Sequence, residues 1–286
     1  MGKIVIVGSG PAGCSAALYA ARAGQEVVVI SMGMGALSKA ELIQNYYGFE
    51  EGITGAELYR QGVAGAKAVG AEFITAEVVG LDYTGSLVVQ TTEGDYPADA
   101  VILATGAGRI APKIAGLAEH EGRGVSYCAT CDAFFYRGKM AAVLGSGEYA
   151  LHEVQALLPL AGKVILCTNG EPLTADFPEG VEICTEKLAA VEGEEKVSAL
   201  RLENGELLPV EGLFAALGVA GSAALARKLG APVENGRIVV DEKMQTGIPG
   251  LYAAGDCTGG LLQVCKAVYE GALAATEAIK QIRGKK

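Results

Sequence analysis

Short runs of apolar residues recur along the chain, and each one leads into a glycine-rich turn. The first run, Lys3–Val7, enters the turn Gly8-Ser-Gly-Pro-Ala-Gly13, after which a helix is expected from Cys14 to about Ala23. The second run, Glu26–Ile30, is again apolar at almost every position. Strands that are apolar throughout, rather than at every second residue, are typical of a parallel sheet with both faces covered. The pattern therefore predicts a doubly wound α/β unit.

The same pattern begins again in the second half of the chain. Lys139–Leu144 is apolar and enters a second turn, Gly145-Ser-Gly-Glu-Tyr-Ala150. A helix is then expected as far as Leu158, followed by a strand at Lys163–Cys167. A strand–turn–helix–strand pattern that occurs twice in one chain indicates two related doubly wound units.

The remaining segments fit around these two units. A hairpin is expected around residues 203–206, and the strand Leu251–Ala254 with a helix from about Leu262 is expected to return to the first unit. Short strands separated by glycine turns predict a β-meander inserted in the first unit, at 73–79, 87–92 and 100–104.

The predicted fold class is therefore α/β, with two Rossmann-like three-layer domains, the second inserted in the first. Residues 1–108 and 242–286 are expected to form the first domain. Residues 112–238 are expected to form a central domain with a degenerate nucleotide-binding fold.

Charge and composition narrow the possible partners. The 286 residues carry a formal net charge of −10, with a pI near 4.9. This argues against non-specific binding to nucleic acid or to an acidic membrane surface, because both need basic surface. No apolar stretch reaches 18 residues, and Ile4–Val7 is too short for a secretory segment. We therefore expect a cytoplasmic protein, in which thiols stay reduced unless they are catalytic or bind metal.

The cysteines point to redox chemistry at one place. Of the seven, only Cys128 and Cys131 have close functional spacing. Two intervening residues allow an intramolecular disulfide, and a helix start or a cation nearby can lower the pKa of one thiol. Asp132 follows directly and could supply or accept a proton. A zinc site would need a second pair of ligands, and neither His120 nor His152 has the spacing, so no metal is expected. An inert buried pair is the remaining alternative.

The first glycine-rich turn has the form of a dinucleotide-binding fingerprint. Gly8 permits a tight turn, Gly10 lets the backbone approach a pyrophosphate, and Gly13 allows close packing of the helix on the strand. The helix start offers N–H groups and the positive end of its dipole to phosphates. The acidic residue usual after the second strand is missing, because Ser31 follows Ile30. The contact to the ribose is expected from the backbone or from Ser31.

These features together resemble the low-molecular-weight thioredoxin reductase family of FAD enzymes, and the resemblance covers the whole chain. Its motifs are Gly8-Ser-Gly-Pro-Ala-Gly13, Ala104-Thr-Gly106, Cys128-Ala-Thr-Cys131-Asp132, Met244-Gln-Thr and Ile248-Pro-Gly-Leu-Tyr-Ala-Ala-Gly-Asp256.

The resemblance implies an FAD cofactor, thioredoxin as the partner and a homodimer. It also implies that Cys131 faces the flavin ring, that Cys128 attacks the substrate disulfide, and that Asp132 acts as general acid and base. The cofactor-binding residues that it implies are Gly8, Ser9, Gly10, Pro11, Ala12, Gly13, Asn45, Ala104, Thr105, Gly106, Gly255, Asp256 and Gln263.

The second glycine-rich turn departs from the NADPH-dependent members of this family. A 2′-phosphate needs cationic donors, but no Arg or Lys lies between Lys163 and Lys187. Glu148 and Glu171 would repel it, and the bulky Tyr149 stands in the turn. In these respects the chain is similar to the ferredoxin-dependent flavin thioredoxin reductases, which implies reduced ferredoxin as the electron donor.

Two other functions stay open: an NAD(P)H-dependent reductase with an atypical nucleotide site, and a redox-sensing flavoprotein. The net charge of −10 opposes long-range attraction to an acidic ferredoxin. Docking of ferredoxin would therefore need a local patch of basic residues. Five residues are candidates for this patch, and the alternative is that they are ordinary solvent-exposed residues: Arg109, Lys113, Arg123, Arg137 and Lys139.

Two further pairs of residues could either pack in the protein or take part in function. Cys257 and Cys265 flank the second FAD motif, where packing is favoured over a second redox role. Tyr46 and Tyr47 could stack near the cofactor or simply pack.

Overall fold

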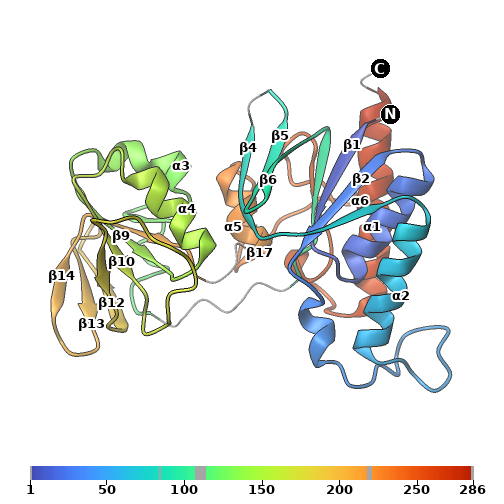
Figure 1. Ribbon diagram of the computed structural model, residues 1–286, viewed down its shortest axis with the longest axis horizontal. Coiled ribbons are helices and arrows are strands. Elements are labelled where there is room, and N and C mark those ends of the chain that lie inside the picture. Colours follow the sequence, from blue (N-terminus) through green and yellow to red (C-terminus); the bar gives the residue numbers. More distant parts are fainter. Residues whose placement is uncertain (1, 84, 107–113, 218–220, 285–286) are drawn as a thin grey trace. The chain divides into compact units, whose positions relative to one another are not determined.

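The computed structural model describes residues 2–83, 85–106, 114–217 and 221–284, and it leaves the side chains of Thr130 and Cys131 undescribed. The chain divides into two compact units. Unit 1 comprises Met1–Gly108 and Gly221–Lys286, and unit 2 comprises Arg109–Ala220. Figure 1 labels helices and strands of both units.

Unit 1 is built on a five-stranded parallel sheet in the order β18-β7-β1-β2-β3. Its buried strands are rich in Val and Ile, which suit a sheet covered on both faces. The five strands are β1 (Lys3–Val7), β2 (Glu26–Ser31), β3 (Glu72–Thr75), β7 (Ala100–Leu103) and β18 (Leu251–Ala253).

Helices pack on this sheet, and an antiparallel meander lies on its other side (Figure 1). The helices and 3₁₀ turns are α1 (Pro11–Arg22), η1 (Gly35–Lys39), α2 (Gly55–Ala68), α5 (Ser222–Lys228), η3 (Asp256–Thr258) and α6 (Val264–Gly284). The meander is β4 (Val78–Tyr83), β5 (Leu87–Thr91) and β6 (Gly94–Ala98), and a small hairpin is β16 (Val233–Glu234) and β17 (Arg237–Ile238).

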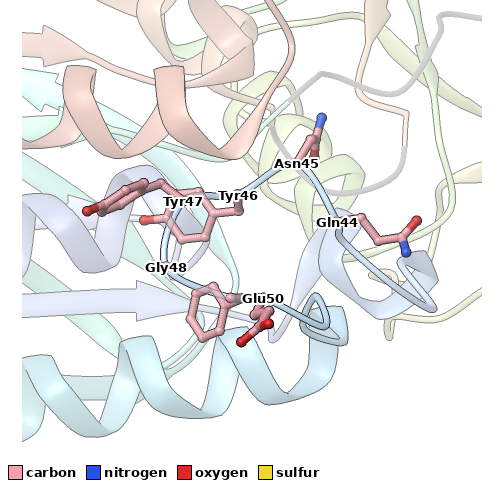
Figure 2. A pocket seen from close by; sticks show the side chains of 7 residues that line it. Gln44, Asn45, Tyr46, Tyr47, Gly48 and Glu50 are labelled. Carbon is pink, nitrogen blue, oxygen red and sulfur yellow. The ribbon is translucent and has the colours of Figure 1, made fainter.

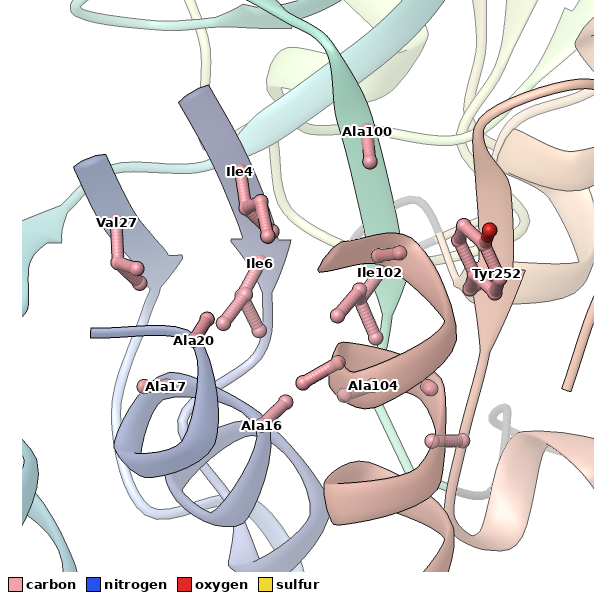
Figure 3. Packing of buried hydrophobic residues seen from close by; sticks show 14 of the residues in the cluster. Ile4, Ile6, Ala16, Ala17, Ala20, Val27, Ala100, Ile102, Ala104 and Tyr252 are labelled. Carbon is pink, nitrogen blue, oxygen red and sulfur yellow. The ribbon is translucent and has the colours of Figure 1, made fainter. Parts of the chain in front are cut away.

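The core of unit 1 combines large residues from the sheet with small ones from the helices (Figure 3). Ile4, Ile6 and Ile102 are fully buried, and they face the alanine-rich sides of α1 and α6. Alanine keeps the helix axes close to the sheet and to each other. The closest approach is at Gly271 of α6, where a Cβ would overlap the backbone carbonyl of Ala12 in α1.

Unit 2 repeats the architecture with a parallel sheet in the order β11-β10-β9-β15-β8. Its strands are β8 (Val125–Ser126), β9 (Met140–Leu144), β10 (Lys163–Cys167), β11 (Glu182–Cys184) and β15 (Gly212–Ala215). The helices are α3 (Ala129–Asp132), η2 (Ala133–Tyr136) and α4 (Glu148–Leu157). A separate antiparallel sheet contains β12 (Leu188–Glu192), β13 (Ala199–Leu202) and β14 (Leu207–Pro209).

The α/β class with two parallel sheets is confirmed, as is the hairpin around residues 203–206. Two of the three expected meander strands differ. The expected strand 100–104 is β7 of the parallel sheet, paired with β1 and β18. The segment 73–79 is divided between two sheets. It contains most of β3, which pairs in parallel with β2, and the first residues of β4. The break falls at Ala76 and Glu77, between a strand of the parallel sheet and a strand of the meander.

The expected central domain, 112–238, extends too far toward the C-terminus. Residues from Gly221 onward belong to unit 1, where α5 contacts β4 and β17. The Ser222 hydroxyl lies 2.7 Å from the Thr105 hydroxyl, and the Ser222 N–H donates to the same oxygen at 2.9 Å. These bonds join the start of α5 to the end of β7. The segment between the first two expected ranges, which end at residue 108 and begin at residue 112, lies outside the described residues.

Among the described residues, no helix is both long and apolar enough to cross a membrane.

The close contact of α1 and α6 gives a stability prediction. Gly271→Ala places a methyl group against the Ala12 carbonyl, and overpacking of this kind costs about 1–3 kcal/mol of unfolding free energy. Gly65→Ala on α2 is the matched control, because no atom lies within 4 Å of the added methyl. Helix propensity predicts that the control is more stable than the parent by up to about 1 kcal/mol. Urea unfolding compares the two, and an unchanged stability for Gly271→Ala would show that α6 is free to shift.

Candidate functional site

A cavity of about 480 Å³ opens in unit 1 where the carboxyl ends of the parallel strands meet. Cavities that hold cofactors commonly measure about 300–1,000 Å³. It is lined by twelve of the thirteen cofactor-binding residues predicted from the sequence, namely Gly8, Ser9, Gly10, Pro11, Ala12, Asn45, Ala104, Thr105, Gly106, Gly255, Asp256 and Gln263. The structure thus brings together three motifs that lie far apart in the chain, together with Asn45 and Gln263.

The turn between β1 and α1 forms one wall of this cavity. Gly8 has φ +109°, and a Cβ there would overlap the Ala104 carbonyl. Gly13 does not line the cavity, because it packs against the carbonyl of Gly8. A Cβ on Gly10 would meet no protein atom within 4 Å, so the backbone at this point is open to the cavity. Pro11 begins α1, and the first N–H groups of a helix have no partner within it.

Ser31 stands where an acidic residue often binds a ribose, but it is not among the described residues that line the cavity. Its hydroxyl donates to the hydroxyl of Ser9 at 2.7 Å. Ser9 in turn is 3.2 Å from the Gly33 carbonyl. The network fixes the segment after β2, and residues 33–37 of that segment line the cavity. Its glycines are the only feature of this segment that could have indicated such a role from the sequence.

A buried ion pair holds the turn that carries Asp256. Lys266 and Glu270, one turn apart on α6, lie 2.9 Å apart. Glu270 accepts the N–H of Gly255 at 2.8 Å, and Lys266 donates to the Gly255 carbonyl at 2.8 Å. Both backbone groups of Gly255 are therefore bound by side chains of α6. Lys–Glu pairs at this spacing are common on exposed helix faces, so the sequence alone does not distinguish this one.

A side-chain contact between distant segments borders the cavity. Asn45 donates to the amide oxygen of Gln263 at 2.9 Å. The loop that follows Asn45 borders a second, shallow pocket (Figure 2). Tyr46 stacks on Phe49 with ring centroids 5.9 Å apart, while Tyr47 is 98% exposed. The packing interpretation therefore fits Tyr46, and neither ring lines the main cavity.

The redox motif lies in unit 2, between β8 and η2. Cys128 is buried and disulfide-bonded, while the side chain of Cys131 lies outside the described part of the structure. Ser126 connects the parts of this loop: its hydroxyl donates to Asp132 at 2.7 Å and accepts the Cys128 N–H at 3.1 Å. The carboxylate of Asp132 is thus held close to the backbone of the redox cysteine.

Helix α4 fixes the same loop from the other side. The Tyr149 hydroxyl donates to the carbonyl of Tyr127 at 2.9 Å, and a carboxylate oxygen of Glu153 accepts the Ala129 N–H at 2.5 Å. Tyr149 and Glu153 are 2% and 1% exposed. From the sequence, Tyr149 was expected to stand in a nucleotide-binding turn, and no role was expected for Glu153. The available signal was the position of Glu153, four residues after Tyr149 and next to Val154, on the side of the helix that the structure buries.

The second glycine-rich turn is covered by its own chain. Thr174 donates its N–H to the Ser146 carbonyl at 2.8 Å, and a Cβ on Gly147 would lie 3.0 Å from the Thr174 hydroxyl. Gly147 is the residue before α4, where a dinucleotide would place its pyrophosphate. The segment around Thr174 therefore occupies space beside that helix start.

Two aromatic rings are exposed directly after the redox helix. Phe134 and Phe135 are 65% and 67% exposed, which is unusual for phenylalanine. The Arg137 guanidinium lies 5.3 Å from the centre of the Phe134 ring, and Lys139 lies 5.9 Å from that of Tyr136. An apolar surface flanked by cations thus follows the redox helix directly in the chain. Of the other candidate cations, Arg123 donates to the Glu119 carbonyl, while Arg109 and Lys113 lie outside the described residues.

The five remaining cysteines are free. Burial raises the pKa of Cys257 to about 11 and that of Cys14 to about 12. Both are then protonated at neutral pH, and the thiolate is the reactive form. Cys257 also contacts the carbonyls of Leu103 and Ala254, so its environment suits packing. Burial likewise raises the pKa of Cys167, and Cys265 is exposed.

Three comparisons with known proteins find relatives along nearly the whole chain. Residues 2–271 match the family model described as pyridine nucleotide-disulphide oxidoreductase. A thioredoxin reductase of Aquifex aeolicus is 36% identical, over 99% of this chain and 94% of its own length.

Two solved structures are similar as well. The atypical thioredoxin reductase TRi from Desulfovibrio vulgaris Hildenborough is 40% identical, with a TM-score of 0.92 over 99% of both chains. A ferredoxin-flavin thioredoxin reductase from Clostridium acetobutylicum is 35% identical, with a TM-score of 0.76 over 99% of this chain and 98% of its own.

Proposed function

Because the chain belongs to the pyridine nucleotide-disulphide oxidoreductase family, we propose that it is an FAD-dependent thioredoxin reductase whose redox pair is Cys128 and Cys131. The observation that carries the proposal is the buried disulfide at Cys128, held in a loop with Asp132. Cys131 is the cysteine nearest to Cys128 in the sequence, and the spacing of two intervening residues allows an intramolecular disulfide, so we assign it as the partner of Cys128.

The cavity of unit 1 fits FAD. The open backbone at Gly10 and the start of α1 suit the pyrophosphate, which needs N–H donors and a positive helix end. Asp256, held by the Lys266–Glu270 pair, is available to accept hydroxyl groups of the ribityl chain, and Asn45 with Gln263 to bind the flavin ring. When bound, FAD supplies the transfer of electrons to a disulfide.

The residues of unit 2 would then carry out disulfide exchange. Reduction of the Cys128–Cys131 bond takes two electrons and two protons and leaves two thiols. The Cys128 thiolate attacks one sulfur of the thioredoxin disulfide, and a bond forms between the two proteins as the substrate disulfide breaks. Cys131 then attacks Cys128, which releases reduced thioredoxin and restores the disulfide. Asp132 takes and returns the protons of these thiols.

The surface beside the redox loop suits a protein partner. Exposed aromatic rings next to arginine are typical of the central residues of protein interfaces, and Phe134, Phe135 and Arg137 combine these types. We propose that thioredoxin docks here. The resemblance to this family also supports a homodimer, which stays a prediction.

Reduced ferredoxin is the electron donor that we favour. The second glycine-rich turn is covered by Thr174, and the side chain of Tyr149 is committed to the redox loop. The segment between Lys163 and Lys187 offers no cation for a 2′-phosphate. One of the similar structures is a ferredoxin-flavin enzyme. An NAD(P)H donor at an atypical site is the alternative donor, and a redox-sensing flavoprotein without a disulfide substrate is the alternative function.

Substitution of the redox cysteine tests the function. Cys128→Ser should reduce turnover of thioredoxin by roughly 100-fold or more, because a hydroxyl does not exchange with a disulfide, while FAD stays bound. Turnover is measured with photochemically reduced enzyme, so that the natural donor is not needed. Cys184→Ser, which changes a free cysteine in β11, is the control and should match the parent. Thioredoxin turnover that survives in Cys128→Ser would refute the proposal.

The donor is tested by anaerobic stopped-flow reduction of the FAD-loaded enzyme. Reduced ferredoxin should bleach the flavin absorbance rapidly, while NADPH and NADH at millimolar concentration should leave it largely oxidised over the same time. Dithionite provides the control that the flavin is reducible. Rapid bleaching by either nucleotide would contradict the ferredoxin assignment and favour the alternative donor.

A further inference from the structure

Glu153 is a buried carboxylate next to the redox disulfide, and the disulfide exchange described above does not use it. It lies in the middle of α4 and is 1% exposed. A buried carboxylate lowers stability strongly unless it is hydrogen-bonded or paired. One of its oxygens accepts the Ala129 N–H at 2.5 Å, and Ala129 follows Cys128 directly as the first residue of α3. One oxygen of this buried group is therefore placed at the backbone amide that follows Cys128.

Several other titratable groups face this part of unit 2. On α4, the Nδ1 atom of His152 lies 3.3 Å from the second oxygen of Glu153, and the Tyr149 hydroxyl is bound to Tyr127. On α3, Asp132 is bound to Ser126. On η2, burial raises the pKa of Tyr136, with Asp132 and Glu211 adding to the rise.

The amide that Glu153 occupies matters for the acidity of Cys128. Backbone N–H groups that donate to a thiolate stabilise it and lower the pKa of the thiol. Here the Ala129 N–H is directed to a carboxylate, which also brings a negative charge close to the cysteine. Both effects oppose formation of the Cys128 thiolate. A dithiol whose thiolate form lacks stabilisation is a better reductant, because a stabilised reduced form makes a pair oxidising.

We propose that Glu153 is a positioning residue that holds the redox loop and keeps the Cys128 thiol weakly acidic, so that the pair passes its electrons on to thioredoxin. The proposal rests on the redox role assigned to Cys128. It also gives a function to α4, which in a nucleotide-binding unit would serve a pyrophosphate. Tyr149 and Glu153, one turn apart on this helix, together bind the residues on either side of Cys128.

The test measures the thiol directly. Full-length, FAD-loaded protein carrying Cys131→Ser keeps Cys128 as a single free thiol in its loop. The rate of alkylation of Cys128 by iodoacetamide is followed by peptide mass spectrometry from pH 5 to pH 10, which gives the pKa as the inflection of the profile. Glu153→Gln keeps the shape and an acceptor oxygen but removes the charge. Glu179→Gln, at an exposed position of unit 2, is the matched control.

We expect Glu153→Gln to lower the inflection by about one pH unit, which corresponds to about tenfold faster alkylation on the acidic side of the profile. Glu179→Gln should follow the parent. The same profile is measured for His152→Asn with Glu153 intact. The difference between its inflection and that of the parent is the contribution of the His152 imidazole to the pKa of Cys128.

An inflection that stays at the parent value in Glu153→Gln, or moves upward, overturns the proposal. A rate that changes by the same factor at every pH also overturns it, because that result reports only a loosened loop. Glu153→Gln is used rather than Glu153→Ala because it preserves the packing of α4. Alkylation needs neither thioredoxin nor an electron donor, so this result and the assay of thioredoxin turnover can fail independently.

Discussion

Close backbone contact between α1, the strand ends and α6 is the constraint on which the cofactor cavity of unit 1 depends. A side chain at Gly8 would overlap the end of β7, one at Gly13 would overlap the Gly8 carbonyl, and one at Gly271 would overlap α1. These contacts bring the start of α1 to the sheet edge at which the Ala104-Thr-Gly106 and Gly255-Asp256 turns also lie. The cavity is therefore shaped mainly by backbone, as an extended ligand with a pyrophosphate requires.

Unit 2 also has a five-stranded parallel sheet with a glycine-rich turn after its central strand, but it uses that turn and the helix after it differently. The chain around Thr174 lies on the turn, and two buried polar residues of α4 bind the redox loop. A helix that would support nucleotide binding in one unit supports a disulfide in the other. A helix that binds the redox loop needs no cations for a 2′-phosphate, and it uses the tyrosine of the turn as a hydrogen-bond donor. The two departures seen in the sequence are therefore consistent with this single use of α4.

The fold was predictable from the sequence because apolar strands and glycine-rich turns are local patterns. The strands at Lys3–Val7 and Lys163–Cys167 were placed to the residue. The second domain boundary was placed too far toward the C-terminus, because the bonds between Ser222 and Thr105 join residues 117 positions apart and leave no local pattern.

The residues of the candidate site also fall into two classes, those that the sequence could predict and those that it could not. The residues that line the cavity carry recognisable motifs, whereas Lys266, Glu270 and Glu153 act through tertiary contacts to backbone groups. A lysine or glutamate in a helix is usually solvent-exposed, so composition conceals such roles. Tyr47 is the opposite case: it lies two positions after Asn45, a predicted cofactor-binding residue, but its side chain is exposed to solvent.

The central claim is that a flavin and the Cys128 disulfide exchange electrons within one protein. It is tested most directly by anaerobic reductive titration with dithionite, followed by flavin absorbance. The account predicts that the parent takes up four electrons per flavin, two for FAD and two for the disulfide, and that Cys128→Ser takes up two. Equal uptake of two electrons by both proteins would contradict it.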